Sequence, residues 1–190
     1  MKSICIYCGS NPGRDPGFAA AARAVGKRLA EAGLDIVYGG GQVGLMADVA
    51  DAALAVGGRV VGVIPEFLAI KEIAHLDLTE LYVVQSMHAR MAHLSDAFIA
   101  LPGGIGTMEE MFEIWTWGQL GQHRKPVGLL NVNGYYDDLV AFLDKMAGQD
   151  FLAADHRASL MVAERIDDLL DAFRGYQAPP GDVRLKIAQT

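Results

Sequence analysis

The chain has 190 residues, of which 52% are hydrophobic, and its formal net charge is −7. This length suits a single domain with one buried core, and the hydrophobic content excludes a disordered protein. The acidic balance disfavours nucleic acid as a partner. It does not exclude a small anionic ligand, because a local nest of backbone amides binds phosphate on an acidic protein.

The N-terminal apolar run covers residues 3–8 and then meets Gly9. It is too short for a membrane span and lacks the layout of a signal peptide. We therefore expect a cytoplasmic protein with no membrane partner.

Cys5 and Cys8 have the spacing C-x-x-C, which occurs in redox and metal sites. They fall in a predicted strand, however, where residues three apart point to opposite faces. No second cysteine pair exists to complete a zinc site. We interpret both as small buried residues and expect no metal.

Strand-like and helical patterns alternate in chain order. Strands are predicted at residues 3–8, 35–38, 59–64, 81–85, 97–101 and 126–131. Helices are predicted at 18–32, 44–56, 87–94, 135–146 and 166–173, and a further helix follows residues 102–110 and ends near residue 120. Apolar strands that alternate with helices indicate a parallel sheet covered on both faces, in a doubly wound α/β fold. We expect one domain over residues 1–175 and a loose C-terminal tail over 176–190.

Ligands of such sheets bind outside the carboxyl ends of the strands. This rule selects five loops, at residues 9–13, 39–44, 64–66, 85–88 and 102–107. Two of them, 39–44 and 102–107, contain more glycine than a turn alone requires.

The loop at residues 39–44 fits G-x-G-x-x-G, the dinucleotide fingerprint. It follows the second predicted strand rather than the first, and no convincing acidic residue ends a strand about 20 residues later. Three interpretations stay open here: an NAD site, a structural glycine turn, and a loop that approaches a mononucleotide.

The segment from Pro102 to Glu110 joins a buried strand to a helix and carries Gly103, Gly104 and Gly106. One interpretation is a helix start in which Thr107 is the N-cap and Glu110 the third residue of a capping box. That leaves the glycines unexplained, since they cost backbone entropy. The other is a phosphate site at the helix N-terminus, with Glu110 one turn further on, near a sugar.

Arg90 lies on the short helix that follows the loop at residues 85–88. An exposed arginine on a helix is normally only solvated, but this helix starts at the ligand end of the sheet. His88 and His93 are five apart, which does not suit a metal pair, and neither has an obvious carboxylate or cysteine companion. No G-x-S-x-G or Walker motif supports a serine hydrolase or an NTPase.

Residues 102–110, PGGIGTMEE, match the signature P-G-G-x-G-T-x-x-E of the LOG ("Lonely guy") family, and residues 87–90, MHAR, resemble its motif M-H-x-R-K. Residues 8–10, 39–46 and 125–131 are also similar to family segments. The resemblance covers about residues 1–175. Met91 replaces the usual lysine of the second motif, and Ala47 replaces a glycine.

The resemblance implies a Rossmann-like homodimer, without metal or organic cofactor, that cleaves the N-glycosidic bond of a nucleoside 5′-monophosphate. It implies Arg90 and Glu110 as catalytic residues, and as substrate-binding residues Ser10, Gly41, Met87, Gly103, Gly104, Gly106 and Thr107. Some relatives are labelled lysine decarboxylase, but no lysine here ends a strand beside a visible pyridoxal phosphate site.

Two questions stay open at this point. The substrate is either plain AMP or an N6-prenylated nucleotide, because the side chains around N6 cannot be placed from the sequence. The alternative to an enzyme is a non-catalytic nucleotide or molybdenum-cofactor carrier of similar fold, which has no need of Arg90 and Glu110.

Overall fold

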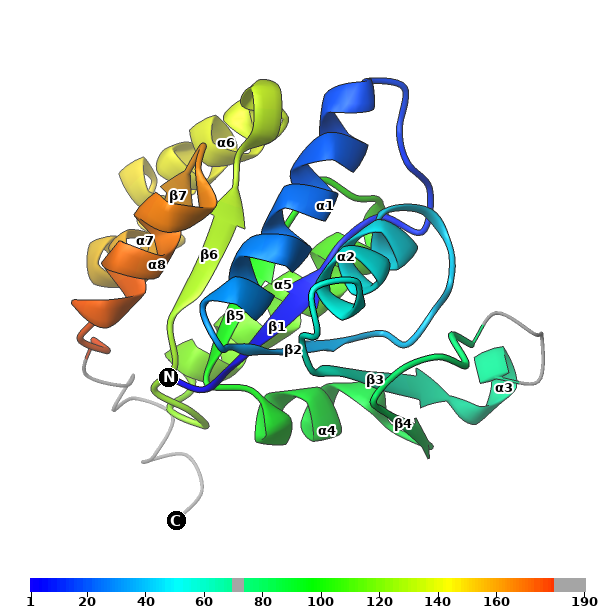
Figure 1. Cartoon of the computed structure of the whole chain (residues 1–190). Helices are drawn as coiled ribbons and strands as arrows, with labels where there is room; N and C mark the ends of the chain where they lie inside the picture. The colour runs from blue at the N-terminus through cyan, green and yellow to red at the C-terminus, as the bar shows by residue number, and fades with distance from the viewer. Residues whose placement is uncertain (70–73, 180–190) are drawn as a thin grey trace, which may run out of the picture.

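A computed structural model of the chain describes residues 1–69 and 74–179 (Figure 1). Within these described residues, seven parallel strands form one sheet in the order β4-β3-β2-β1-β5-β6-β7. The strands are β1 (Ser3–Tyr7), β2 (Asp35–Tyr38), β3 (Val60–Pro65), β4 (Glu80–Val84), β5 (Ala97–Ala100), β6 (Val127–Leu130) and β7 (Leu160–Ala163). The helices are α1 (Pro16–Glu31), α2 (Gly44–Leu54), α3 (Glu66–Ala69), α4 (Met87–Leu94), α5 (Ile105–Gln119), α6 (Asp137–Gly148), α7 (Ala154–Ser159) and α8 (Ile166–Arg174), with a 3-10 turn η1 (Val132–Gly134).

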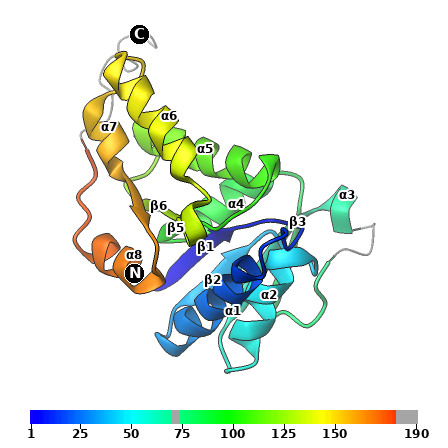
Figure 2. The ribbon, with the colours of Figure 1, turned by 90° about the horizontal axis from the view of Figure 1, so that it is seen from above.

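Helices cover both faces of the sheet, as the alternation of strands and helices predicts. Buried side chains of α1, α2 and α8 pack on one face, and those of α4, α5 and α6 pack on the other. Figure 2 shows α1 and α2 on the opposite side of the sheet from α4 and α5. The predicted Rossmann-like doubly wound α/β fold is therefore confirmed, in a single domain.

The two cysteines illustrate how the strand alternates between these faces. Cys5 packs with the side chains under α4 and α5, whereas Cys8, just after β1, packs with those under α1 and α2. Both are free and buried, and burial raises the pKa of both thiols. The interpretation as two small buried residues on opposite faces is confirmed.

Most element boundaries agree with the sequence within two residues, and β2 and α4 agree fully. One boundary is wrong in an informative way: α5 begins at Ile105, before Thr107. No sequence pattern indicated α3, α7 or the edge strand β7. Residues 176–179 carry no regular structure, and the rest of the predicted tail, 180–190, lies outside the described residues.

The strand order reverses between β1 and β5, which are neighbours in the sheet. The loops that follow these two strands are joined by a hydrogen bond of 3.0 Å from the Gly9 amide to the Pro102 carbonyl. A topological switch point of this kind is where doubly wound sheets bind ligands. Over residues 1–69 and 74–179, no helix has both the length and the apolar character that crossing a membrane requires.

Candidate active site

A cavity of about 830 Å³ lies along the carboxyl edge of the sheet. It is lined by Ile6, Cys8, Ser10, Asn11, Gly39, Met46, Pro65, Phe67, Leu68, Gln85, Ser86, Met87, His88, Gly104, Ile105, Gly106, Thr107, Glu109 and Glu110. The cavity thus brings together Ser10, Met87, Gly104, Gly106, Thr107 and Glu110 of the residues that the sequence singled out. Its size is that of a pocket for a small organic molecule.

A smaller cavity of about 250 Å³ adjoins it and shares Ser10, Asn11 and Gly104. It is lined in addition by Gly103, by Phe18 and Tyr135, and by the remainder of the loop after β1. Each of the five loops selected by the strand-end rule contributes to at least one of the two cavities.

The N-terminus of α5 is open to a ligand. Its N-cap is Gly104, which has no side chain to accept a hydrogen bond from the first amides of the helix. Thr107 is the third helical residue and is buried, so it is not the N-cap, and the capping-box interpretation of Thr107 and Glu110 is wrong. A helix N-terminus without an internal acceptor binds anions through its amides and its dipole.

The three glycines of this segment do different work. A Cβ on Gly103 would lie 2.1 Å from Thr107 Oγ1 and 2.9 Å from the Gly9 amide nitrogen, so this residue is small to permit packing. A Cβ on Gly104 or Gly106 would meet no atom of residues 1–69 and 74–179 within 4 Å, and neither residue has a positive φ. Neither packing nor backbone conformation therefore requires glycine at these two positions. Close approach of a ligand to the backbone amides does, because a side chain there would stand in its way.

Glu110 faces the same cavity one turn of helix after Gly106. Its pKa is raised from the ordinary 4.5 to about 8, chiefly because burial penalises the charged carboxylate. The negative charges of Glu109 and Glu113 on the same helix raise it further. A strongly shifted carboxyl group in a cavity is typical of acid–base chemistry.

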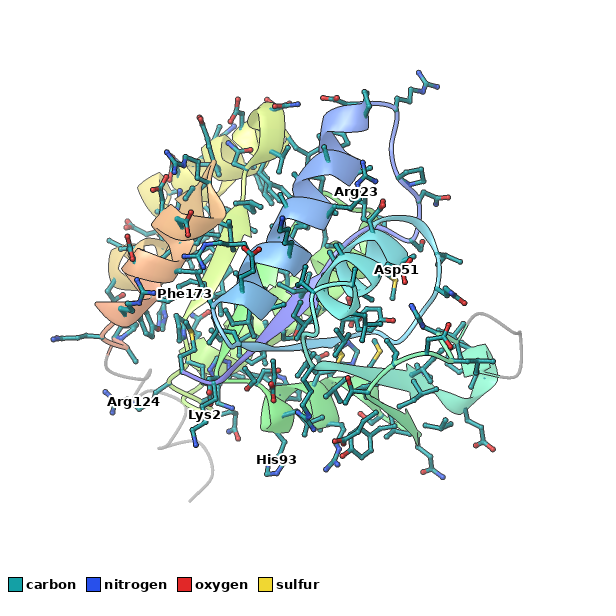
Figure 3. The ribbon with its side chains drawn as sticks, in the orientation of Figure 1. Lys2, Arg23, Asp51, His93, Arg124 and Phe173 are labelled. Atoms are coloured by element: carbon teal, nitrogen blue, oxygen red, sulfur yellow. The ribbon has the colours of Figure 1, made fainter. Side chains whose placement is uncertain are left out.

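His88 has partners that the sequence analysis failed to assign. Its Nε2 lies 3.1 Å from Glu109 Oε2, with which it forms a hydrogen bond, and 3.1 Å from Glu113 Oε2. The expectation that His88 lacks a carboxylate companion is therefore wrong, because α5 supplies two. His93 is exposed and points away from the sheet (Figure 3). The cluster of His88, Glu109 and Glu113 ties α4 to α5 beside the cavity.

The loop at residues 39–44 combines packing with ligand access. Gly40 and Gly44 have φ values of 70° and 52°, and a Cβ on Gly44 would lie 2.4 Å from the Ser10 carbonyl carbon. The loop is also held from outside by the buried His75, whose amide donates to the Gly40 carbonyl at 2.9 Å. Gly39 lines the larger cavity, whereas Gly41 is buried and lines neither cavity.

Arg90 also lies outside the lining of both cavities. Its guanidinium carbon is 4.2 Å from the centroid of the Tyr82 ring on β4, a cation–π arrangement. Arg90 lies three residues after Met87, which does line the larger cavity, so the two are neighbours on one face of α4.

Several lining residues were not singled out from the sequence. Phe67 and Leu68 lie on α3, a helix of four residues with no detectable periodicity. Met46 sits beyond the glycines of its loop. Tyr135 follows β6, and applying the strand-end rule to that strand as well would have found it.

The fold and the site define a class: a Rossmann-like α/β protein whose switch-point cavity joins an open helix N-terminus to a half-buried carboxyl group. Comparison with known proteins narrows this class. Residues 46–173 match the protein family described as "Possible lysine decarboxylase". The cytokinin riboside 5'-monophosphate phosphoribohydrolase of Rhodococcoides fascians is 49% identical over 91% of this chain and 89% of its own. The enzyme of the same name, LOG7, from Arabidopsis thaliana is 44% identical over 98% of this chain and 88% of its own.

The chain therefore belongs to the LOG family of cytokinin riboside 5'-monophosphate phosphoribohydrolases. Solved structures agree on the fold. The molybdenum cofactor binding protein from Rippkaea orientalis superposes with a TM-score of 0.68 at 22% identity, over 92% of this chain and 97% of that one. A likeness at this identity concerns the fold alone.

Proposed function

We propose that this chain is a nucleoside 5′-monophosphate phosphoribohydrolase, which hydrolyses the N-glycosidic bond of AMP or an N6-prenylated relative to the free base and ribose 5-phosphate. One observation carries the proposal: the open N-terminus of α5 and the Glu110 carboxyl group face a single cavity. A phosphate on the former places the sugar of the same nucleotide beside the latter, since one turn of helix spans about 5.4 Å.

The amides at the start of α5 bind the 5′-phosphate in this proposal. Gly104 and Gly106 leave space for the phosphate oxygens, and Thr107 and Ser10 border the same space. Gly103 sets the loop by packing on Thr107. Preorganised amides at a helix N-terminus suit a dianionic phosphate without a metal ion.

Glu110 acts on the sugar. Cleavage of a glycosidic bond builds positive charge on the ribose, and an ionised carboxylate nearby stabilises that charge. The same carboxylate accepts a proton from the attacking water as a general base. Both roles need the ionised form, which a pKa of about 8 makes the minor form at neutral pH.

The remaining candidates serve the ends of the substrate. Met87 lines the cavity together with Phe67 and Leu68, which makes an apolar wall for the base. Gly41 supports Met46, since a Cβ on Gly41 would lie 3.2 Å from the Met46 methyl group. Arg90 lines neither cavity and stacks on Tyr82, so its part in the proposal, to hold the substrate and stabilise charge on the ribose–base portion, rests on its match to the family motif. A homodimer and a cytoplasmic location complete the proposal.

The test is incubation with AMP and with isopentenyladenosine monophosphate, followed by chromatography for the free base. We expect base release by the wild type and its loss in Glu110→Gln and Arg90→Ala. If the wild type binds both nucleotides tightly but releases no base, the carrier alternative holds instead. If it binds only NAD or NADP in calorimetry, the glycine loop at residues 39–44 is a dinucleotide site.

A further inference from the structure

The loop that precedes α5 is held by a side chain from a distant part of the chain. The Tyr135 hydroxyl donates a hydrogen bond of 2.6 Å to the Gly103 carbonyl, 32 residues away in sequence. Tyr135 also lines the smaller cavity, where its ring packs edge-on against Phe18 at 5.4 Å between centroids. This contact therefore lies immediately before the first turn of α5, whose N-cap is Gly104.

The position of this carbonyl decides where the next amide points. The described residues contain no cis peptide bond, so the Gly103 carbonyl and the Gly104 N–H lie on opposite sides of one planar peptide. Because the carbonyl points to Tyr135 in the smaller cavity, the Gly104 N–H points away from that cavity. Gly104 also lines the larger cavity, and within residues 1–69 and 74–179 its amide donates to no acceptor.

The neighbouring tyrosine shows what a purely structural hydroxyl looks like here. Tyr136 is 1% exposed, and its hydroxyl donates to the carbonyl of Leu101, at the end of the buried strand region. Tyr135 is 44% exposed, so its ring contributes less to the core. Its hydroxyl nevertheless makes a short, specific bond to the loop.

We propose that Tyr135 is a positioning residue for the substrate phosphate: its hydroxyl fixes the Gly103–Gly104 peptide so that the Gly104 amide is aimed at the phosphate. The inference rests on the proposed function, because it takes the start of α5 as the phosphate site. Without this hydroxyl, the peptide between the two glycines could adopt several orientations, because glycine restricts its backbone little. Tyr135 thus lowers the cost of ordering the loop when the phosphate binds.

The experiment compares Tyr135→Phe with Tyr136→Phe, which make the same chemical change one residue apart. Binding of ribose 5-phosphate and of adenine is measured by calorimetry, kinetics with AMP are recorded, and thermal unfolding reports stability. We expect Tyr135→Phe to weaken ribose 5-phosphate binding about tenfold, the effect of misdirecting one charge-assisted hydrogen bond, and to leave adenine binding unchanged. KM for AMP should rise by a similar factor while kcat changes less than about twofold.

Tyr136→Phe should show the reverse pattern. It leaves a buried carbonyl without its partner and lowers the melting temperature by several degrees, while the affinity for ribose 5-phosphate is retained. If Tyr135→Phe binds ribose 5-phosphate like the wild type, or weakens adenine binding equally, the positioning role is wrong although the proposed function stands. If the wild type binds no ribose 5-phosphate and releases no base from AMP, both are overturned.

Discussion

Replacing Gly106 by alanine should raise the stability of the protein and lower its activity on AMP at the same time. Gly106 is the second residue of α5, its φ is not positive, and a Cβ there would meet no atom within 4 Å in the part of the chain that the structure describes. Alanine loses less backbone entropy than glycine in a helix, which favours folding by up to about 1 kcal/mol. For a domain of this size that is a rise in melting temperature of about 2–4 °C.

The same methyl group should obstruct the substrate. If a phosphate sits on the amides at the start of α5, the space beside Gly106 is where its oxygens approach. Losing one hydrogen bond to a charged group costs about 1.5–3 kcal/mol, so kcat/KM for AMP should fall about tenfold to a hundredfold. The assay pairs thermal unfolding with base release from AMP, measured on one preparation.

Two other glycines calibrate the result. Gly148 ends α6, also has open space around its Cβ position and lines neither cavity, so Gly148→Ala should be stabilised without loss of activity. Gly103→Ala should be destabilised, because its Cβ would collide with Thr107 and with the Gly9 backbone. A Gly106→Ala protein with full activity would refute the placement of the phosphate at this helix.

Three further predictions concern Glu110 and the base. Because the pKa of Glu110 is about 8, kcat/KM should rise about tenfold per pH unit below 8 and level off above it if the carboxylate is the base; a fall above pH 8 would make Glu110 a proton donor. The pKa is higher in the folded chain than the ordinary 4.5 of an unfolded one, so as pH rises from 4.5 to 8 the unfolded state loses its proton first and stability falls; urea titrations should show less of this fall in Glu110→Gln. Phe67→Ala should lower kcat/KM for isopentenyladenosine monophosphate about threefold to tenfold relative to AMP, and equal losses for both would remove Phe67 from the contact with the N6 substituent.

The sequence predicted the loops of the site because that prediction needs only local information. A buried parallel strand followed by glycines marks a carboxyl end, and all such ends meet at one edge of the sheet. The start of α5 was wrong because the pattern T-x-x-E at Thr107 is also a good capping box. Tertiary packing decided otherwise: Thr107 is buried close to Gly103, and the helix begins two residues earlier.

Contacts between elements were beyond the reach of spacing arguments. The carboxylates beside His88 lie 21 and 25 residues further along the chain, on α5. Tyr135, whose hydroxyl binds the Gly103 carbonyl, comes after β6 in the sequence. Strand β7 was missed because it is a half-exposed edge strand of four residues, which leaves no alternation to detect.

The charge of the Glu110 carboxylate and the charge of a phosphate at the start of α5 bear on the same step of the reaction. A dianionic phosphate at the start of α5 would lie near a carboxylate that already repels Glu109 and Glu113. When Glu110 is in the ionised form that both of its roles need, two negative groups therefore oppose each other across the ribose of the bound nucleotide. Positive charge that develops on the ribose lies between them and relieves this repulsion. The arrangement favours the transition state over the bound nucleotide, which is what accelerating the chemical step requires.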